Sequence, residues 1–179
     1  MGRAVREVDE KFAGLGEVHR LMRKAFPREE RIPFPLLLLR QKLGDLEVLA
    51  YYDGSRLCGM SVTCSDSAVC SLMYLAVPER MRGRGVGSSI LRYLRKRHKG
   101  KVFCADIEVP YANAENAEQR LKRLRFYEKN GLMSTHTGYT CRDVDYLVVA
   151  DNGVFNEPLF RAIYDRMFFG LFSPEFVEF

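Results

Sequence analysis

A glycine-rich segment at residues 82–88 has the composition of a phosphate-binding loop. Its residues are Arg82, Gly83, Arg84, Gly85, Val86, Gly87 and Ser88. Glycines at alternate positions let the backbone turn tightly and approach a ligand without a Cβ in the way. The segment follows an apolar run and precedes an amphipathic one, so it is expected to link a strand to a helix whose first N–H groups favour an anion. The two arginines add positive charge and the serine a hydroxyl donor, and the segment therefore predicts a phosphate site.

The spacing of this segment excludes two common nucleotide loops. The nucleoside-triphosphate loop ends in Gly-Lys-Ser/Thr, whereas Gly87 here is followed directly by Ser88. The dinucleotide fingerprint is G-x-G-x-x-G, whereas Gly83, Gly85 and Gly87 are spaced G-x-G-x-G. The ligand is therefore expected to be a different phosphate compound.

A second motif follows about forty residues later, and the two together resemble a known family. The run Arg82-x-x-Gly85-x-Gly87 resembles the coenzyme A signature of the GCN5-related N-acetyltransferase (GNAT) superfamily. Residues 125–132, Arg-Phe-Tyr-Glu-Lys-Asn-Gly-Leu, resemble the family's helix-ending motif, with Leu132 in place of the usual phenylalanine. The resemblance covers roughly residues 3–150.

The resemblance implies a cofactor, a reaction and several site residues. It implies acetyl-CoA as the co-substrate without a metal, and transfer of the acetyl group to a primary amine by direct attack in a ternary complex. Residues 82–88 would hold the pyrophosphate, and Tyr127 would lie near the sulfur and protonate the departing thiolate. The main chain of Leu75, Ala76 and Val77 would pair with the pantetheine arm. Asn116 would contact the pantetheine, with a helix N-cap as the alternative.

An amine that is protonated at neutral pH needs a base before it can attack a thioester. Asp106 and Glu108 are expected to share one face of the strand at 101–109, because alternate strand residues point the same way. Glu108, nearer the end of the strand, is our candidate for the general base, with a water chain or a purely structural carboxylate as alternatives. Cys104 on the same strand could support a covalent route, although a buried core cysteine is the simpler interpretation.

The rest of the chain predicts a single mixed α/β (α+β) domain of the acyl-CoA N-acyltransferase fold. We expect a mostly antiparallel sheet of about seven strands with helices on both faces and an extra C-terminal helix. The GNAT domain is predicted at 1–150, and residues 151–179 are expected to pack on it or to form a homodimer contact. The expected strands are 4–8, 46–52, 57–64, 69–77, 101–109, 133–141 and 144–149, and the expected helices are 11–24, 35–43, 85–98, 116–130 and 156–170.

Composition sets broad limits on the class of protein. The 179 residues are 47% hydrophobic, which suits a folded protein, and the formal net charge is +5. A phosphorylated ligand, a nucleic acid or an acidic surface would each suit this sign, so the charge selects no partner. Five cysteines without a C-x-x-C pair argue against a disulfide framework. The first residues carry no signal-like apolar run and no apolar run is long enough to cross a membrane, so we expect a cytoplasmic protein without membrane or nucleic-acid partners.

Two other functions remain open at this point. A GNAT-like module could sense CoA or bind a partner without catalysis, and the basic stretches at 92–101 and 120–125 could bind nucleic acid rather than coat helix faces. The acceptor, a small-molecule or peptide amine, is expected between the loop at 26–34 and the hairpin at 136–142. Neither segment indicates which amine it binds.

Overall fold

The computed structural model describes residues 4–28, 30–171 and 173–179. Its hydrogen-bonded strands follow the order β1-β2-β3-β4-β5-β7-β6-β8. The chain divides into two compact units, Met1–Cys64 with Met73–Arg97 and Ser65–Leu72 with His98–Phe179. The central strand, β4 (Val69–Ala76), contributes its first half to the second unit and its second half to the first.

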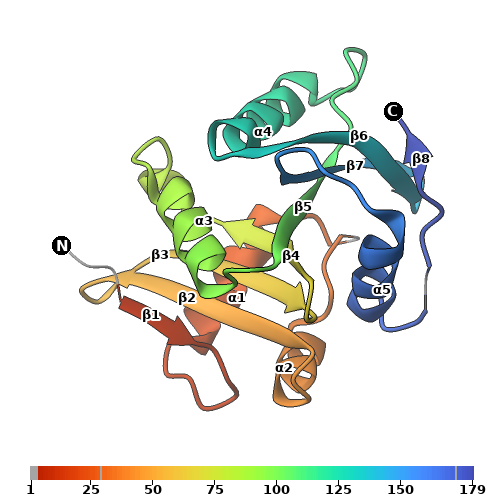
Figure 1. Ribbon diagram of the computed structural model, residues 1–179. Coiled ribbons are helices and arrows are strands. Elements are labelled where there is room, and N and C mark those ends of the chain that lie inside the picture. Colours follow the sequence, from red (N-terminus) through yellow and green to blue (C-terminus); the bar gives the residue numbers. More distant parts are fainter. Residues whose placement is uncertain (1–3, 29, 172) are drawn as a thin grey trace. The chain divides into compact units, whose positions relative to one another are not determined.

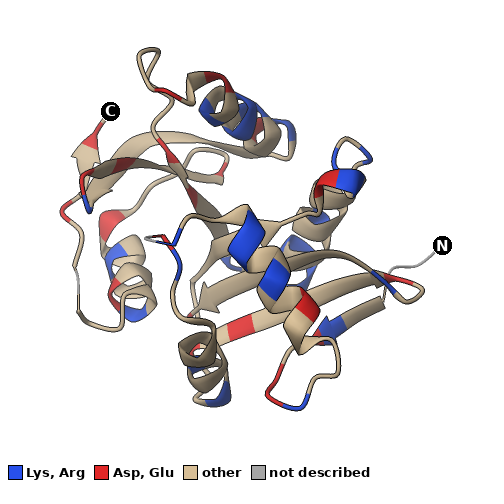
Figure 2. Cartoon of the chain, turned by 180° about the vertical axis from the view of Figure 1, so that it is seen from behind, with Lys and Arg blue, Asp and Glu red and all other residues tan. Residues whose placement is uncertain are grey.

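The first unit is built on an antiparallel meander. In it β1 (Ala4–Glu7) pairs with β2 (Leu46–Asp53), and β2 pairs with β3 (Arg56–Ser65). Helix α1 (Leu15–Ala25) covers one face of these strands and α3 (Val86–Arg97) the other (Figures 1 and 2). Helix α2 (Phe34–Lys42) and a short 3-10 turn, Glu79–Met81, complete the unit. Apolar side chains from the strands and from α1 and α3 form its core, including Val18, Met22, Val48, Met60, Val62, Ile90 and Leu94.

The second unit combines a parallel pair with an antiparallel hairpin. The first half of β4 runs parallel to β5 (Val102–Glu108), from Val69 opposite Val102 to Leu72 opposite Ala105. Strand β7 (Val144–Asp151) lies antiparallel between β5 and β6 (Leu132–Cys141). Helices α4 (Ala117–Lys129) and α5 (Glu157–Met167) lie on opposite sides of these strands (Figures 1 and 2). Each of the five predicted helices is present in the described part of the chain, with shifted ends.

Local sequence signals explain several element boundaries. Gly131, at φ 83°, ends α4 where a left-handed residue is expected. The hairpin turn uses Arg142 and Asp143, both with positive φ. Two such residues give a two-residue turn whose twist matches that of the antiparallel strands that it connects. The start of α1 was predicted at residue 11, but the helix begins at Leu15 because residues 9–14 form turns.

The C-terminal segment adds a strand that we did not expect. Strand β8 (Val177–Glu178) pairs with β6 and brings the described sheet to eight strands instead of about seven. Helix α5 buries Phe160, Ile163, Tyr164 and Met167, whereas Leu159 is 39% exposed. A two-residue strand is too short to leave an alternating pattern, so it could not be recognised beforehand. Among the described residues, no helix is long and apolar enough to cross a membrane.

Candidate active site

The glycine loop lies in the first unit, between the 3-10 turn and the start of α3. Gly83 and Gly85 both have φ of 71°, in the left-handed region where other residues are strained. The backbone N–H of Ser89 donates to the Gly85 carbonyl at 3.0 Å, which begins the helical hydrogen bonding of α3. Residues 82–85 are exposed and Val86 is buried. The loop thus presents its backbone outward at the positive end of a helix, as a phosphate site requires.

Glycine at residue 59 allows α3 to lie close to the sheet, a role that we did not anticipate. A Cβ built on Gly59 would lie 2.6 Å from Cδ1 of Ile90 and 2.9 Å from the carbonyl oxygen of Ala76. Side chains do not tolerate such distances, so only glycine lets Ile90 of α3 rest on β3 at this point. The available signal was a lone glycine inside a strand pattern, which often marks a close approach.

The end of β4 supplies the residues expected to meet the pantetheine arm. Ala76 is buried, and Leu75 and Val77 are half-buried. The carbonyl oxygen of Val77 accepts a hydrogen bond from Nε of Arg82 at 3.2 Å, which ties the loop's first arginine back to this strand end. Pairing of this main chain with a pantetheine remains a prediction.

Glu108, at the end of β5 in the second unit, is held by two arginines of α4. Its Oε1 lies 2.9 Å from Nη2 of Arg120, and its Oε2 lies 2.6 Å from Nη1 of Arg123. Arg120 also donates to the Val109 carbonyl at 3.0 Å and, through Nε, to Oδ1 of Asn116 at 2.6 Å. This network fastens the beginning of α4 to the end of β5.

Asn116 occupies the N-cap position of α4 but caps it differently from expectation. Its side-chain oxygen accepts from the Arg120 guanidinium, and within the described residues it accepts no hydrogen bond from a backbone N–H of the helix. The helix-cap alternative is therefore correct for its position and wrong for its side chain. Contact of Asn116 with a pantetheine remains a prediction.

Asp106, two residues before Glu108, has different partners. Its Oδ2 accepts from the phenol of Tyr139 at 3.1 Å, and its Oδ1 accepts from the phenol of Tyr164 in α5. Burial raises the pKa of Asp106 from 3.8 to about 6, and the two phenol hydrogen bonds work against that rise. The two carboxylates of β5 thus have partners on different elements. Because these partners are distant in sequence, the sequence alone could not identify them.

Tyr127 is buried on α4, with 7% of its surface exposed, and packs edge-on against Phe126 at 5.2 Å between ring centroids. Burial raises the pKa of Tyr127 to about 12; the Arg123 charge lowers it and the Asp106 charge raises it further. The phenol therefore stays protonated across the physiological range and is available as a proton donor.

Cys104 fits the core-cysteine alternative. It is fully buried, and burial raises the pKa of its thiol well above the usual value, with the Asp106 charge as a further cause. A thiol that resists ionisation is a poor nucleophile. The five cysteines form no disulfide within the described parts of the chain.

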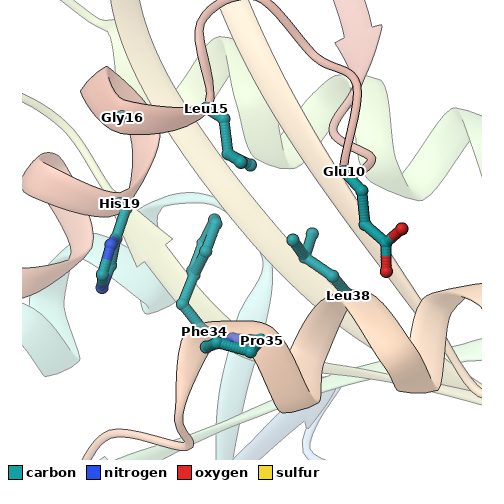
Figure 3. A pocket seen from close by; sticks show the side chains of 7 residues that line it. All are labelled: Glu10, Leu15, Gly16, His19, Phe34, Pro35 and Leu38. Atoms are coloured by element: carbon teal, nitrogen blue, oxygen red, sulfur yellow. The ribbon is translucent and has the colours of Figure 1, made fainter.

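A small surface cavity of about 270 Å³ lies between α1 and α2 of the first unit (Figure 3). It is lined by Glu10, Leu15, Gly16, His19, Phe34, Pro35 and Leu38. The His19 ring stacks on Phe34 at 4.8 Å, and burial with the nearby Arg23 and Arg31 lowers the pKa of His19. Phe34 is shared with the predicted acceptor loop at 26–34. The described residues contain no group of acidic, histidine or cysteine side chains that could hold a metal.

Known proteins with similar sequence or structure match these features. Residues 44–131 match the family model described as an acetyltransferase (GNAT) domain. An aminoglycoside 6'-N-acetyltransferase from Enterococcus faecium is similar in structure, with a TM-score of 0.62, 14% identity and coverage of 86% of this chain and 98% of that one. A GNAT family acetyltransferase from Elizabethkingia anophelis with acetyl-CoA bound has a TM-score of 0.57 and 14% identity, and the match covers 83% of this chain and 97% of that one. The ribosomal-protein-S18-alanine N-acetyltransferase from Escherichia coli has a TM-score of 0.56 and 13% identity, and the match covers 87% of this chain and 96% of that one. Among curated protein sequences, none matches significantly.

The strand order and the glycine loop before α3 define the acyl-CoA N-acyltransferase fold. Residues 44–131 of the chain form a GNAT acetyltransferase domain by this match, and the matched segment runs from the turn before β2 to the glycine after α4. It therefore contains both the glycine loop and Tyr127.

Proposed function

We propose that this protein is an acetyl-CoA-dependent N-acetyltransferase that acetylates a primary amine by direct attack in a ternary complex. The observation that carries the proposal is the loop at 82–88, with two left-handed glycines exposed at the start of α3 inside the family match. Solved neighbours with CoA or acetyl-CoA bound support the same co-substrate.

Each predicted site residue has a proposed role. Backbone N–H groups of residues 83–88, with the charges of Arg82 and Arg84, would bind the pyrophosphate. The main chain of residues 75–77 and the side chain of Asn116 would orient the pantetheine. Tyr127 would protonate the thiolate, and a carboxylate of β5, either Glu108 or Asp106, would accept the proton of the amine.

The acceptor is proposed to be a small-molecule or peptide amine. The neighbours include two aminoglycoside 6'-N-acetyltransferases and an enzyme for the alanine of a ribosomal protein, so both classes occur on this fold. We further propose a cytoplasmic location, for which five cysteines in their thiol form are suited, and allow a homodimer through the C-terminal segment.

The test is release of CoA thiol from acetyl-CoA in the presence of an aminoglycoside, a polyamine and an alanine-terminated peptide. We expect release above background with at least one of them, and a fall of kcat on the order of 10²-fold or more in Tyr127→Phe. Tyr111→Phe is the matched control, because it removes an exposed phenol of the same unit that bonds to Asp145 at 2.9 Å. If acetyl-CoA binds but thiol release stays at background with all amines, the protein is a CoA-binding module instead of an enzyme.

A further inference from the structure

Asp106 is placed unusually for a structural carboxylate. It stands in β5 opposite Val148 of β7, and each of its oxygens accepts a hydrogen bond from a different phenol. Tyr139 comes from β6 and Tyr164 from α5, and their rings meet edge-on at 5.3 Å. Asp106 is half-buried, whereas Glu108 is buried, with 8% of its surface exposed.

The chemistry of the partners distinguishes the two carboxylates. A guanidinium only donates hydrogen bonds, so a proton added to Glu108 would meet N–H donors and would displace a charged partner. A phenol both donates and accepts. When Asp106 takes up a proton, its new O–H can donate to the oxygen of Tyr139 or Tyr164, and the cluster stays hydrogen-bonded in both states.

We propose that Asp106, held between the phenols of Tyr139 and Tyr164, is the group that accepts the proton of the amine, and that the C-terminal helix α5 completes the catalytic machinery by supplying Tyr164. This inference rests on the proposed acetyltransferase function. It makes Asp106 a catalytic residue and Tyr139 and Tyr164 positioning residues. Glu108 then serves to fasten α4, which carries Tyr127, to β5.

The ammonium group of the acceptor gives one proton to a carboxylate oxygen of Asp106 and becomes a neutral amine. Its lone pair attacks the thioester carbonyl carbon, the N–C bond forms and the C–S bond breaks. The electron pair of that bond leaves on sulfur and takes the proton of the Tyr127 phenol, and the second N–H proton of the new amide nitrogen passes to solvent. Water restores the proton of Tyr127 and removes that of Asp106.

The titration of Asp106 agrees with this role. Its pKa of about 6 lies close to neutral pH, where a base is most effective. The titratable groups whose pKa values respond to the charge of Asp106 are Tyr139 of β6, Tyr164 of α5, Tyr127 of α4 and Cys104 of β5 itself. All four are neutral at pH 7 with pKa values raised by burial, so Asp106 titrates in this range without a second ionising neighbour among them.

Helix α5 lies beyond the segment that matches the family model, which ends at residue 131. Helix α5 nevertheless makes several contacts at and around the cluster. Tyr164 is fully buried and packs against Phe176 at 5.3 Å, and Met167 receives a hydrogen bond from Ser71 of β4. Removing the Tyr164 hydroxyl should therefore change the cluster's hydrogen bonding without unfolding the helix.

The experiment measures the pH profile of kcat for wild type, Asp106→Asn, Tyr164→Phe and Tyr111→Phe, with the most active amine of the aminoglycoside, polyamine and peptide probes. We expect the acid limb of wild type to have its midpoint near pH 6. Asp106→Asn should lower kcat on the order of 10²-fold and abolish that limb. Tyr164→Phe should move the midpoint to higher pH, because the lost hydrogen bond had lowered the pKa of Asp106. Tyr111→Phe should behave as wild type.

Calorimetric measurement of acetyl-CoA binding to the same proteins separates a failure of the proposed function from a failure of the role assigned to Asp106. If wild type turns over while Asp106→Asn keeps its kcat and acid limb, Asp106 is not the base and this inference is wrong although the proposed function stands. If Asp106→Asn is unfolded, an unshifted profile in Tyr164→Phe overturns the inference by itself. If wild type binds acetyl-CoA but acetylates none of the probes, the proposed function fails and this inference with it.

Discussion

Ile90 of α3 packs so closely over Gly59 of β3 that a Cβ atom at residue 59 would lie 2.6 Å from its Cδ1. Strand β3 and the helix that follows the glycine loop are thereby fixed at contact distance. The orientation of the loop depends on that contact, because α3 begins at Val86, directly after Gly85.

Gly59→Ala should destabilise the first unit, because α3 must move or Ile90 must change its rotamer. We expect a loss of about 1–3 kcal/mol in the free energy of unfolding, measured by urea denaturation. Gly16→Ala is the matched control: it makes the same change within α1, where an added Cβ meets nothing within 4 Å. It should leave stability unchanged or raise it by up to about 1 kcal/mol. Equal effects of the two substitutions would contradict the packing described.

Glu108→Gln should destabilise the second unit, because it removes a buried charge that two arginines share. The expected loss is about 1–3 kcal/mol, since Arg120 and Arg123 are left without their anion but are themselves partly exposed. Glu118→Gln provides the comparison, because the ion pair of Glu118 with Lys122 is on the exposed face of α4. The stability of Glu118→Gln should equal that of wild type within error. A larger loss of stability in Glu118→Gln than in Glu108→Gln would contradict the stabilising role of the Glu108 network.

Stability should depend on pH through Asp106. Burial raises the pKa of this carboxyl from 3.8 to about 6 in the folded protein, so the folded state holds the proton more tightly than the unfolded state. Its contribution to the free energy of unfolding is therefore present in full below pH 3.8 and is lost as the pH rises through about 6. Wild type should lose about 1–3 kcal/mol relative to Asp106→Asn between these limits. If the free energy of unfolding varied with pH in the same way in the two proteins, the pKa of Asp106 would not be raised by folding.

The sequence reveals those parts of the site that are local. Residues 82–88 carry their chemistry within seven positions, and Gly131 ends α4 by its own backbone preference, so both could be predicted without a fold. The alternation of β5 gave Asp106 and Glu108 as candidates, and their order along the strand favoured Glu108, but neither feature could name the partners of the two carboxylates. Their partners are decided by packing: Tyr139 lies 33 residues and Tyr164 58 residues beyond Asp106.

The tail shows the same limit. We expected residues 151–179 to pack on the domain or to form a homodimer contact, and the apolar residues at 171–179 could not decide between the two. In the structure Val177 pairs with Gly138, and the Phe179 N–H donates to the His136 carbonyl at 2.9 Å. The pairing of β6 with β7 shifts register between Ser134 and Gly138. A bulge and a two-residue strand arise from tertiary contacts, and periodicity does not register them.

The central claim, that the loop at 82–88 binds the pyrophosphate of acetyl-CoA, is tested most directly by calorimetric titration of acetyl-CoA into wild type, Gly85→Glu and Gly44→Glu. Both glycines have positive φ, at 71° and 82°, and in both an added Cβ meets nothing within 4 Å, so the two variants carry equal charge and similar backbone strain. We predict binding to wild type and Gly44→Glu, and loss of binding in Gly85→Glu because a carboxylate then faces the phosphates. Binding by Gly85→Glu with the affinity of wild type, or no binding by wild type at millimolar acetyl-CoA, would contradict the account.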